Sequence, residues 1–222
     1  MERGYFITGT DTEVGKTYVT RLLLRQLAAQ GLACAALKPV ASGASVTPEG
    51  LRNDDALQLR QAASVKLPYE DINPYCFAPP IAPHLAAAQA DAVIDLQHIA
   101  GIAQRVAAQV EILLVEGVGG WYVPLGTQTS VADLALRLAY PVILVVGMRL
   151  GCLNHALLSA RAIEDTGLPL AGWIANPVDP DMAAFEDNLA ALKTRIDAPC
   201  LGTLVRDASL DLRCNARAIR LP

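Results

Sequence analysis

The chain has 222 residues, and its 22 acidic side chains outnumber its 18 basic ones, which gives a net charge of −4 at pH 7. Hydrophobic residues make up 53% and charged residues 18%, a balance that argues against intrinsic disorder and against nucleic-acid binding, which needs a basic face. The longest apolar run, Pro141–Met148, is far shorter than the ~20 residues of a membrane-spanning helix, so no membrane association is expected.

Five cysteines occur at wide spacings that match no disulfide framework or zinc-ligand pattern, and the first residues form no apolar signal-peptide segment. We therefore expect a cytoplasmic protein with reduced thiols. Since domains commonly have about 100–200 residues, we expect one domain over residues 1–222.

The first predicted strand, Tyr5–Thr8, leads into the segment GTDTEVGKT (Gly9–Thr17), and a helix is expected over Thr17–Gln30. Glycines let the backbone amides face phosphate oxygens, and the start of the helix adds partial positive charge. Lys16 can reach the β- and γ-phosphates, and the Thr17 hydroxyl can ligate Mg²⁺. The sequence predicts a phosphate-binding loop (P-loop), one residue longer than the common spacing; an ordinary glycine turn is the simpler alternative.

The second and third predicted strands, Ala33–Leu37 and Glu111–Val115, end at Lys38 and Glu116, and a GVGG segment follows Glu116. In open α/β sheets, ligands bind at the carboxyl ends of the strands, so both side chains are expected in one crevice with Lys16. Two converging lysines suit an anionic centre and can stabilise charge that develops during phosphoryl transfer. The alternative is that Lys38 and Glu116 are solvated side chains at the ends of strands.

Asn53, Asp54 and Asp55 open a predicted helix. Asn53 is a natural helix cap, because its side chain can accept a hydrogen bond from a free backbone amide. Two consecutive carboxylates exceed what capping requires, so one of them can complete a Mg²⁺ site with Thr17 and Glu116. The spacing alone supports capping and metal binding equally.

The fourth and fifth predicted strands, Pro141–Val146 and Leu170–Ala175, are also followed by polar segments. After the fourth, the backbone amides of Gly151–Asn154 start a helix and can bind a carboxylate, although simple capping by Asn154 explains them equally well. After the fifth, Asn176–Pro177 is either a plain turn or a contact to a nucleotide base.

A sixth strand is expected at Cys200–Leu204, and the proline-rich segment Pro68–Pro83 is expected to form a surface loop that can cover a site. The remaining predicted helices are approximately Asn53–Ala63, Leu96–Val110, Ser130–Leu138, Leu153–Asp165 and Met182–Ile196. Apolar strands that alternate with helices predict the α/β class. Together with the loop motif, they predict a three-layer P-loop NTPase-like fold, with a mostly parallel central sheet and helices on both faces.

These motifs together resemble the dethiobiotin synthetase family over about the first 180 residues, in the order expected for that family. The long spacing of the phosphate-binding loop is the spacing of this family. The matching segments are GTDTEVGKT (9–17), KPVASG (38–43), NDDA (53–56), NPYCFAPPIAPH (73–84), EGVGGW (116–121), PVILVVG (141–147), RLGCLNHALL (149–158) and AGWIANPV (171–178).

The resemblance implies a ligase of biotin biosynthesis that depends on ATP and Mg²⁺. It would convert 7,8-diaminononanoate and CO₂ (or bicarbonate) into the cyclic urea dethiobiotin, with release of ADP and phosphate. One amine would take up CO₂ as a carbamate, ATP would phosphorylate the carbamate to a mixed anhydride, and the second amine would close the ring. Lys16 and Lys38 would offset the repulsion between the carbamate and the γ-phosphate.

The resemblance also assigns roles to residues by position. Lys38 and Lys16 would be catalytic, and Thr17, Asp55 and Glu116 would be the Mg²⁺ ligands. Substrate contacts would come from Thr12 and Ser42, and, across the interface of a homodimer, from Gly151, Cys152, Leu153 and Asn154. The residues implied to bind ATP are Glu13, Val14, Gly15, Lys16, Thr17, Tyr18, Asp55, Glu116, Gly117, Val118, Gly119, Asn176, Pro177, Val205, Arg206 and Asp207. The segment LGTLVRD, which contains the last three, lacks a proline that the family often has there.

A partitioning-type or nucleotide-switch ATPase of related fold is the main alternative. Such proteins usually carry an extra lysine early in the loop, where this chain has Thr10, Asp11 and Thr12. A cobyrinate-type amide ligase is similar at its N-terminus, but it would need an added glutaminase domain, for which 222 residues leave no room.

Overall fold

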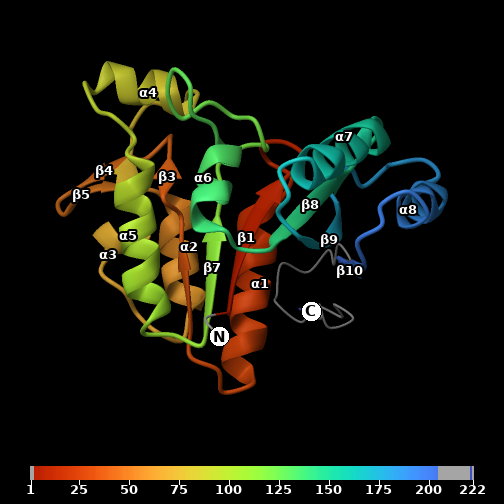
Figure 1. Cartoon of the computed structure of the whole chain (residues 1–222), viewed down its shortest axis with the longest axis horizontal. Coiled ribbons are helices and arrows are strands. Elements are labelled where there is room, and N and C mark those ends of the chain that lie inside the picture. The colour runs from red at the N-terminus through yellow and green to blue at the C-terminus, as the bar shows by residue number, and fades with distance from the viewer. Residues whose placement is uncertain (1–2, 205–220, 222) are drawn as a thin grey trace.

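A parallel sheet forms the centre of the computed structural model, which describes residues 3–204 and residue 221 (Figure 1). The strands lie in the order β10-β9-β8-β1-β7-β2, and each pairs in parallel with its neighbours. All six strands predicted from the sequence are confirmed. They are β1 (Arg3–Gly9), β2 (Cys34–Leu37), β7 (Ile112–Glu116), β8 (Val142–Met148), β9 (Leu170–Pro177) and β10 (Cys200–Thr203).

Successive strand residues pack into two separate cores, one on each face of the sheet. Phe6 and Leu113 belong to one core, whereas Ile7 and Leu114 belong to the other. The first core is closed mainly by α5 (Leu96–Ala107), α6 (Val131–Leu138), α7 (Cys152–Glu164) and α8 (Phe185–Lys193). The second is closed by α1 (Lys16–Ala29) and by α2 (Asp54–Ala62). The predicted three-layer α/β architecture, with helices on both faces, is therefore confirmed (Figure 1).

The ends of the helices follow the predicted signals in most places. Asn53 caps α2 through its side chain, which accepts a hydrogen bond from the backbone amide of Ala56. α1 ends two residues before Gly31, whose φ of +80° only glycine adopts readily. α8 is shorter than the predicted helix Met182–Ile196, because Ala184 has a left-handed backbone conformation and the helix starts only after it.

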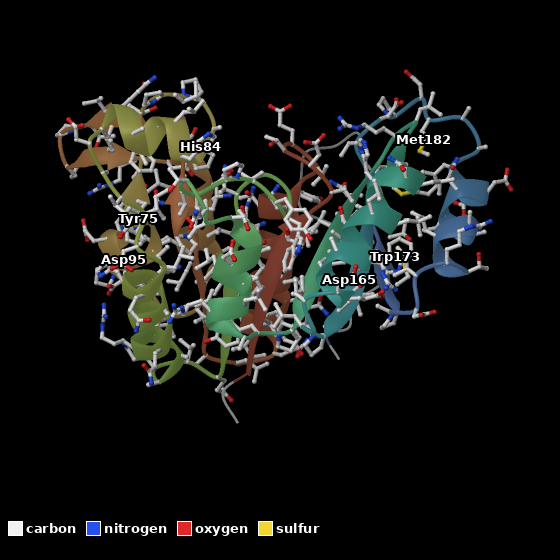
Figure 2. All side chains as sticks on the ribbon, turned by 45° about the horizontal axis from the view of Figure 1, so that its top comes forward. Tyr75, His84, Asp95, Asp165, Trp173 and Met182 are labelled. Carbon is white, nitrogen blue, oxygen red and sulfur yellow. The ribbon has the colours of Figure 1, made fainter. Side chains whose placement is uncertain are left out.

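The segment Pro68–Pro83 is more ordered than the predicted surface loop. It contains the one-turn helix α3 (Tyr69–Ile72) and the short strand β6 (Tyr75–Cys76), which pairs in parallel with β3 (Val40–Ala41). Next to it lie a hairpin and a further helix, β4 (Ser45–Thr47), β5 (Gly50–Arg52) and α4 (Pro83–Gln89). Figure 2 shows Tyr75 of this segment and His84 of α4 on the opposite side of the molecule from Trp173 and Met182.

The structure also bears on the state of the thiols and on membrane-spanning helices. Cys34, Cys76, Cys152 and Cys200 are free thiols, as expected. Over residues 3–204, every helix is too short or too polar to cross a membrane.

Candidate active site

The predicted phosphate-binding loop joins the end of β1 to the start of α1. Gly15, the last residue before the helix, has a φ of +88°. The loop is held from β8 and β9: the Thr10 amide donates to the carbonyl of Val145 (3.0 Å), and Asn176 Nδ2 donates to the carbonyl of Val14 (2.9 Å). Among the described residues, no side chain caps α1, so its first amides remain available for an anion.

A cleft with a volume of about 740 Å³ lies at the carboxyl ends of β1, β2 and β7. This is where ligands bind in open α/β sheets. Its walls bring together ten of the residues predicted from the sequence to bind ATP or substrate or to act in catalysis, although they are far apart in the chain. The predicted residues that line it are Thr12, Glu13, Gly15, Lys16, Thr17, Lys38, Ser42, Asp55, Val118 and Gly119.

Lys16 is buried in the wall of this cleft, and its Nζ donates a hydrogen bond to the main-chain carbonyl of Asp11 (2.9 Å). Burial, together with the nearby charge of Lys38, lowers the pKa of Lys16 to about 8. The nearby carboxylates, which raise the pKa of Lys16, therefore offset only part of the lowering by burial and by Lys38. An anion bound in the cleft would stabilise its charged form.

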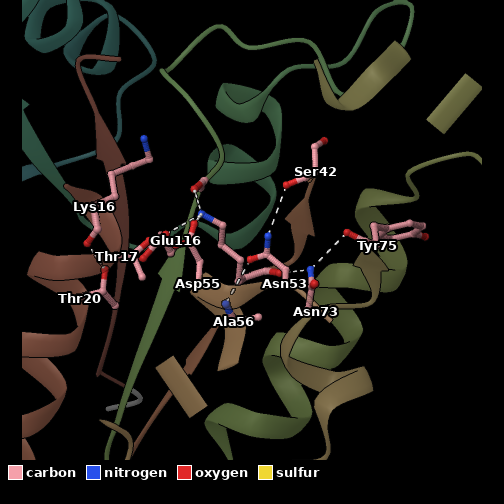
Figure 3. Close-up of polar contacts among 12 residues, drawn as sticks. Lys16, Thr17, Thr20, Ser42, Asn53, Asp55, Ala56, Asn73, Tyr75 and Glu116 are labelled. Carbon is pink, nitrogen blue, oxygen red and sulfur yellow. Dashed lines mark hydrogen bonds and ion pairs between the residues drawn. The ribbon is translucent and has the colours of Figure 1, made fainter. Parts of the chain in front are cut away.

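Glu116, at the end of β7, is the centre of a buried polar cluster (Figure 3). It is fully buried, and its Oε1 accepts hydrogen bonds from Lys38 Nζ (2.6 Å) and Thr17 Oγ1 (2.7 Å). Lys38 Nζ also lies 3.4 Å from Asp55 Oδ2 and 3.3 Å from the carbonyl oxygen of Gly117. Burial alone would lower the pKa of Lys38, but the carboxylates of Glu116 and Asp55 outweigh it, so its net pKa is raised and Lys38 stays charged.

Asn53, Asp54 and Asp55 have different surroundings at the start of α2. Asn53 caps α2 and Asp54 is exposed, whereas Asp55 is the one of the two carboxylates that lines the cleft and pairs with Lys38. Successive helical residues point about 100° apart, which explains why only one of the two carboxylates faces Lys38.

The oxygen atoms of Thr17, Asp55 and Glu116 form a donor set that suits a hard cation such as Mg²⁺. Glu116 Oε2 is buried and has no hydrogen-bond partner among the described residues, so it has a free acceptor position. Across residues 3–204, no cluster of three or more His, Cys, Asp or Glu side chains is arranged to hold a metal ion. The predicted set of Thr17, Asp55 and Glu116 is not such a cluster, because it has only two carboxylates and its third member is a hydroxyl.

Other predicted residues lie outside the cleft. Gly151 starts α7 with a φ of +93°, and Cys152 after it is buried. The suggestion that Asn154 caps this helix is wrong, because no described side chain caps α7 and Gly151 occupies the cap position. Asn176 and Pro177 pair with Gly147 and Met148 in the sheet, so the alternative that they form a plain turn is also wrong.

The remaining predicted ATP-binding residues have varied positions. Val14 is buried under the loop, Tyr18 lies in the first turn of α1, and Gly117 accepts the hydrogen bond from Lys38 described above. Val205, Arg206 and Asp207 lie outside the described residues.

Several residues that line the cleft were missed in the sequence. Pro80, Ile81, Ala82 and Pro83 form part of its wall; the predicted loop and the matching segment 73–84 both include them, but neither assigned them a role. Asn53, Ala41 and Val123 also line it, and no sequence signal distinguishes Ala41 or Val123 from ordinary apolar residues. An ion pair between Arg149 and Asp11 (2.7 Å), which joins the loop before α7 to the phosphate-binding loop, was not predicted either.

Solved structures with the same fold include nucleotide-binding proteins of low sequence identity. The MinC:MinD cell division protein complex from Aquifex aeolicus matches with a TM-score of 0.59 and 14% identity, over 94% of this chain and 83% of that one. A ParA family ATPase from Chlorobium tepidum matches with a TM-score of 0.58 and 12% identity, over 94% and 86%. At these identities the likeness shows the P-loop NTPase-like fold alone.

The relatives in sequence are more specific. Residues 3–212 match a family described as "AAA domain". The ATP-dependent dethiobiotin synthetase BioD of Pseudomonas aeruginosa is 53% identical over 203 residues, which cover 91% of this chain and 89% of the relative. The protein of the same name from Aromatoleum aromaticum is 48% identical over 220 residues, covering 99% and 98%. This chain belongs to the family of ATP-dependent dethiobiotin synthetases.

Proposed function

We propose that this cleft uses ATP and Mg²⁺ to close a cyclic urea from 7,8-diaminononanoate and CO₂, giving dethiobiotin, ADP and phosphate within a single catalytic domain. The observation that carries the proposal is the convergence of Lys16 and Lys38 with Glu116, Thr17 and Asp55 on one cleft. Membership of the synthetase family supports the overall reaction.

The reaction brings anions together, and the two lysines would make this possible. One amine of the substrate takes up CO₂ as a carbamate, and a carbamate oxygen then attacks the γ-phosphorus of ATP as ADP leaves. The second amine attacks the carbonyl carbon of the mixed anhydride, and phosphate leaves as the ring closes. Lys38, held charged by Glu116 and Asp55, and Lys16 would stabilise the charge that develops during both steps.

Thr17, Asp55 and Glu116 would hold Mg²⁺, which would supply positive charge to offset the negative charge of the phosphates. The unpaired Oε2 of Glu116 supports this assignment, as does the choice of oxygen donors. The Thr17 hydroxyl donates its hydrogen to Glu116 Oε1, which leaves its oxygen lone pairs free to bind a cation.

The remaining contacts divide between nucleotide and diamine. The loop residues Thr12 to Thr17 and the Val118–Gly119 segment would surround the phosphates, and Asn176 with Pro177 would face the base. Ser42 would contact the carbamate or an amine, because its Oγ lies in the cleft wall, is buried and has no described partner.

Phosphate release from ATP is expected only when the diamine and bicarbonate are both present, because ATP has no acceptor before the carbamate forms. Continuous measurement of phosphate release with each component omitted in turn checks this, and chelation of Mg²⁺ by EDTA should stop the reaction. Robust hydrolysis without the diamine would contradict the proposal. So would stimulation by a protein or DNA partner, which would favour the partitioning type of ATPase.

We also propose that the chain forms a homodimer in which Gly151–Asn154 of one copy reach the cleft of the other. Two observations support this: that segment lies outside the cleft of its own chain, and two leucines near it are exposed. Leu150 is 95% exposed and Leu158 is 62% exposed.

Analytical ultracentrifugation is expected to give twice the chain mass of 23.5 kDa. Leu150→Asp should shift the population toward monomer and raise the KM for the diamine more than that for ATP, because it would place a charge in the apolar interface. Val93→Asp is the matched control, since Val93 is also exposed (83%) but lies between α4 and α5. A monomeric wild-type chain with full activity would rule the dimer out.

A further inference from the structure

Lys38 lies one residue beyond the end of β2, so the central sheet does not hold its backbone. Residues at the end of α3 hold it instead. The Lys38 amide donates to the carbonyl of Ile72 (2.8 Å), and the Lys38 carbonyl accepts from Asn73 Nδ2 (2.7 Å). Both backbone polar groups of Lys38 are therefore fixed by α3 and its cap, and Figure 3 shows Asn73 between Asn53 and Tyr75.

Tyr69, the first residue of α3, connects Asn73 to the start of α2. The Tyr69 hydroxyl donates to Asn73 Oδ1 (3.0 Å) and accepts from the backbone amide of Asn53 (2.7 Å). Asn53 is the cap of the helix that carries Asp55, whose carboxylate lies 3.4 Å from Lys38 Nζ. Lys38 and Asp55 thus face each other in the cleft. Their backbone segments are also connected outside the cleft, by the hydrogen bonds of Asn73 and Tyr69.

This arrangement is buried and fully paired. Tyr69 and Asn73 are 5% and 3% exposed, and neither lines the cleft. The guanidinium of Arg52 lies 4.2 Å from the centre of the Tyr69 ring, which it covers. Burial raises the pKa of Tyr69, so its hydroxyl keeps the proton that it donates to Asn73. A buried polar group that loses its hydrogen-bond partner raises the free energy of the folded state. A fully paired network therefore favours one fixed geometry.

We propose that Tyr69 and Asn73 are positioning residues that set the relative placement of Lys38 and Asp55 for the reaction. The inference rests on the proposed function, because it assumes that Lys38 and Asp55 act on the phosphates and their metal ion. Neither Tyr69 nor Asn73 touches the reactants; they act through the two backbones that they connect.

Tyr69→Phe is the direct test, because it removes only the hydroxyl that joins Asn53 to Asn73. kcat is expected to fall about 10- to 100-fold, since small displacements of catalytic groups have effects of this size. In EDTA, where no Mg²⁺ is available, ADP affinity would depend on the phosphate-binding loop. Calorimetry should show that this affinity stays within about twofold of wild type. The gain in ADP affinity on adding Mg²⁺ should shrink by about 10-fold, because Asp55 is displaced.

Tyr75→Phe is a matched control. The Tyr75 hydroxyl accepts from the backbone amide of Asp95 (3.0 Å), which is the cap of α5, a helix that contributes no residue to the cleft. Both variants therefore remove a tyrosine hydroxyl from the amide of a helix cap, and Figure 2 shows Tyr75 next to Asp95. Tyr75→Phe should leave kcat and the effect of Mg²⁺ within about twofold of wild type.

Amide hydrogen exchange separates the positioning role from the proposed chemistry. Tyr69→Phe should increase exchange in the peptide that contains Asn53 and Asp55, with no change in the phosphate-binding loop. Asn73→Asp, which removes the donor to the Lys38 carbonyl, should have the same effects as Tyr69→Phe. If the wild type shows no diamine-dependent use of ATP, the proposed function fails while the exchange result still stands. If Tyr69→Phe matches Tyr75→Phe in kcat, Mg²⁺ effect and exchange, the positioning role is overturned.

Discussion

Replacing Lys38 by glutamine is expected to lower kcat by at least about 100- to 1,000-fold, the range seen when one preorganised donor to a developing charge is lost. Lys38 is the cation closest to Glu116 and Asp55 among the described residues, and its raised pKa keeps it charged over the whole working pH range. Glutamine keeps a polar donor, but it is one atom shorter than lysine and carries no charge. ADP binding, which depends mainly on the phosphate-binding loop, should change much less than kcat.

The same substitution is expected to destabilise the fold. Glu116 is fully buried, and without Lys38 its carboxylate would keep the Thr17 hydroxyl as its one described hydrogen-bond donor. Removing one partner of a buried ion pair costs about 3–5 kcal/mol. Urea unfolding should therefore show a lower midpoint for Lys38→Gln, whereas Lys38→Gln/Glu116→Gln should regain much of the stability without regaining turnover.

Lys193→Gln serves as the control for loss of one positive charge, because Lys193 is exposed at the end of α8, away from the cleft. It should leave turnover and stability unchanged. Near-normal turnover in Lys38→Gln would remove Lys38 from the mechanism. A double variant that regains stability and also turnover would show that Lys38 matters only for folding.

The sheet and its covering helices could be predicted because their signals are local and strong. Strands such as β8 are apolar at nearly every position, as a strand buried on both faces requires. Since parallel strands end at one edge of the sheet, the positions of Lys38 and Glu116 in the sequence already placed them at a common site. The rule relies on strand direction and needs no knowledge of side-chain contacts.

Features that depend on pairing between distant short segments could not be predicted. β3 and β6 have two residues each and pair across more than thirty positions of sequence, so neither shows a periodic pattern. The hydrogen bonds from Tyr69 to Asn73 and from Asn73 to Lys38 join the segments that lead into these two strands. In the sequence, Tyr69 and Asn73 are an ordinary aromatic residue and a turn residue, and only the folded chain reveals their contacts.

The choice between Asp54 and Asp55 needed structure for a different reason. Both residues carry the same functional group, and both lie in the first turn of α2. Which carboxylate enters the cleft depends on the rotation of the helix about its axis. That rotation is fixed by packing of Leu59 and Ala56 and by the bond from Tyr69 to the cap, none of which the spacing encodes.

Gly15→Ala is expected to weaken ADP binding by about 10- to 100-fold, the equivalent of losing one hydrogen bond to a charged group. Gly15 has a φ of +88°, which strains any residue with a side chain, and a Cβ there would collide with the Asn176 side chain. Relief of both effects requires the Val14–Lys16 backbone to move, and this backbone presents the amides that would bind phosphate. Calorimetric titration with ADP measures the loss.

Two comparisons separate strain from collision. Gly31→Ala has a similar φ of +80° but no atom within 4 Å of its Cβ, so it should lower stability by about 1–2 kcal/mol and leave ADP affinity unchanged. Gly15→Ala/Asn176→Gly removes the collision and keeps the strain. Its loss of ADP affinity should be smaller than the product of the losses in Gly15→Ala and in Asn176→Gly. The reason is that each single change already disturbs the same contact between the loop and β9. If the changes in the free energy of ADP binding in the two single variants simply add in the double variant, then strain at Gly15 alone weakens binding and Asn176 does not restrict the loop.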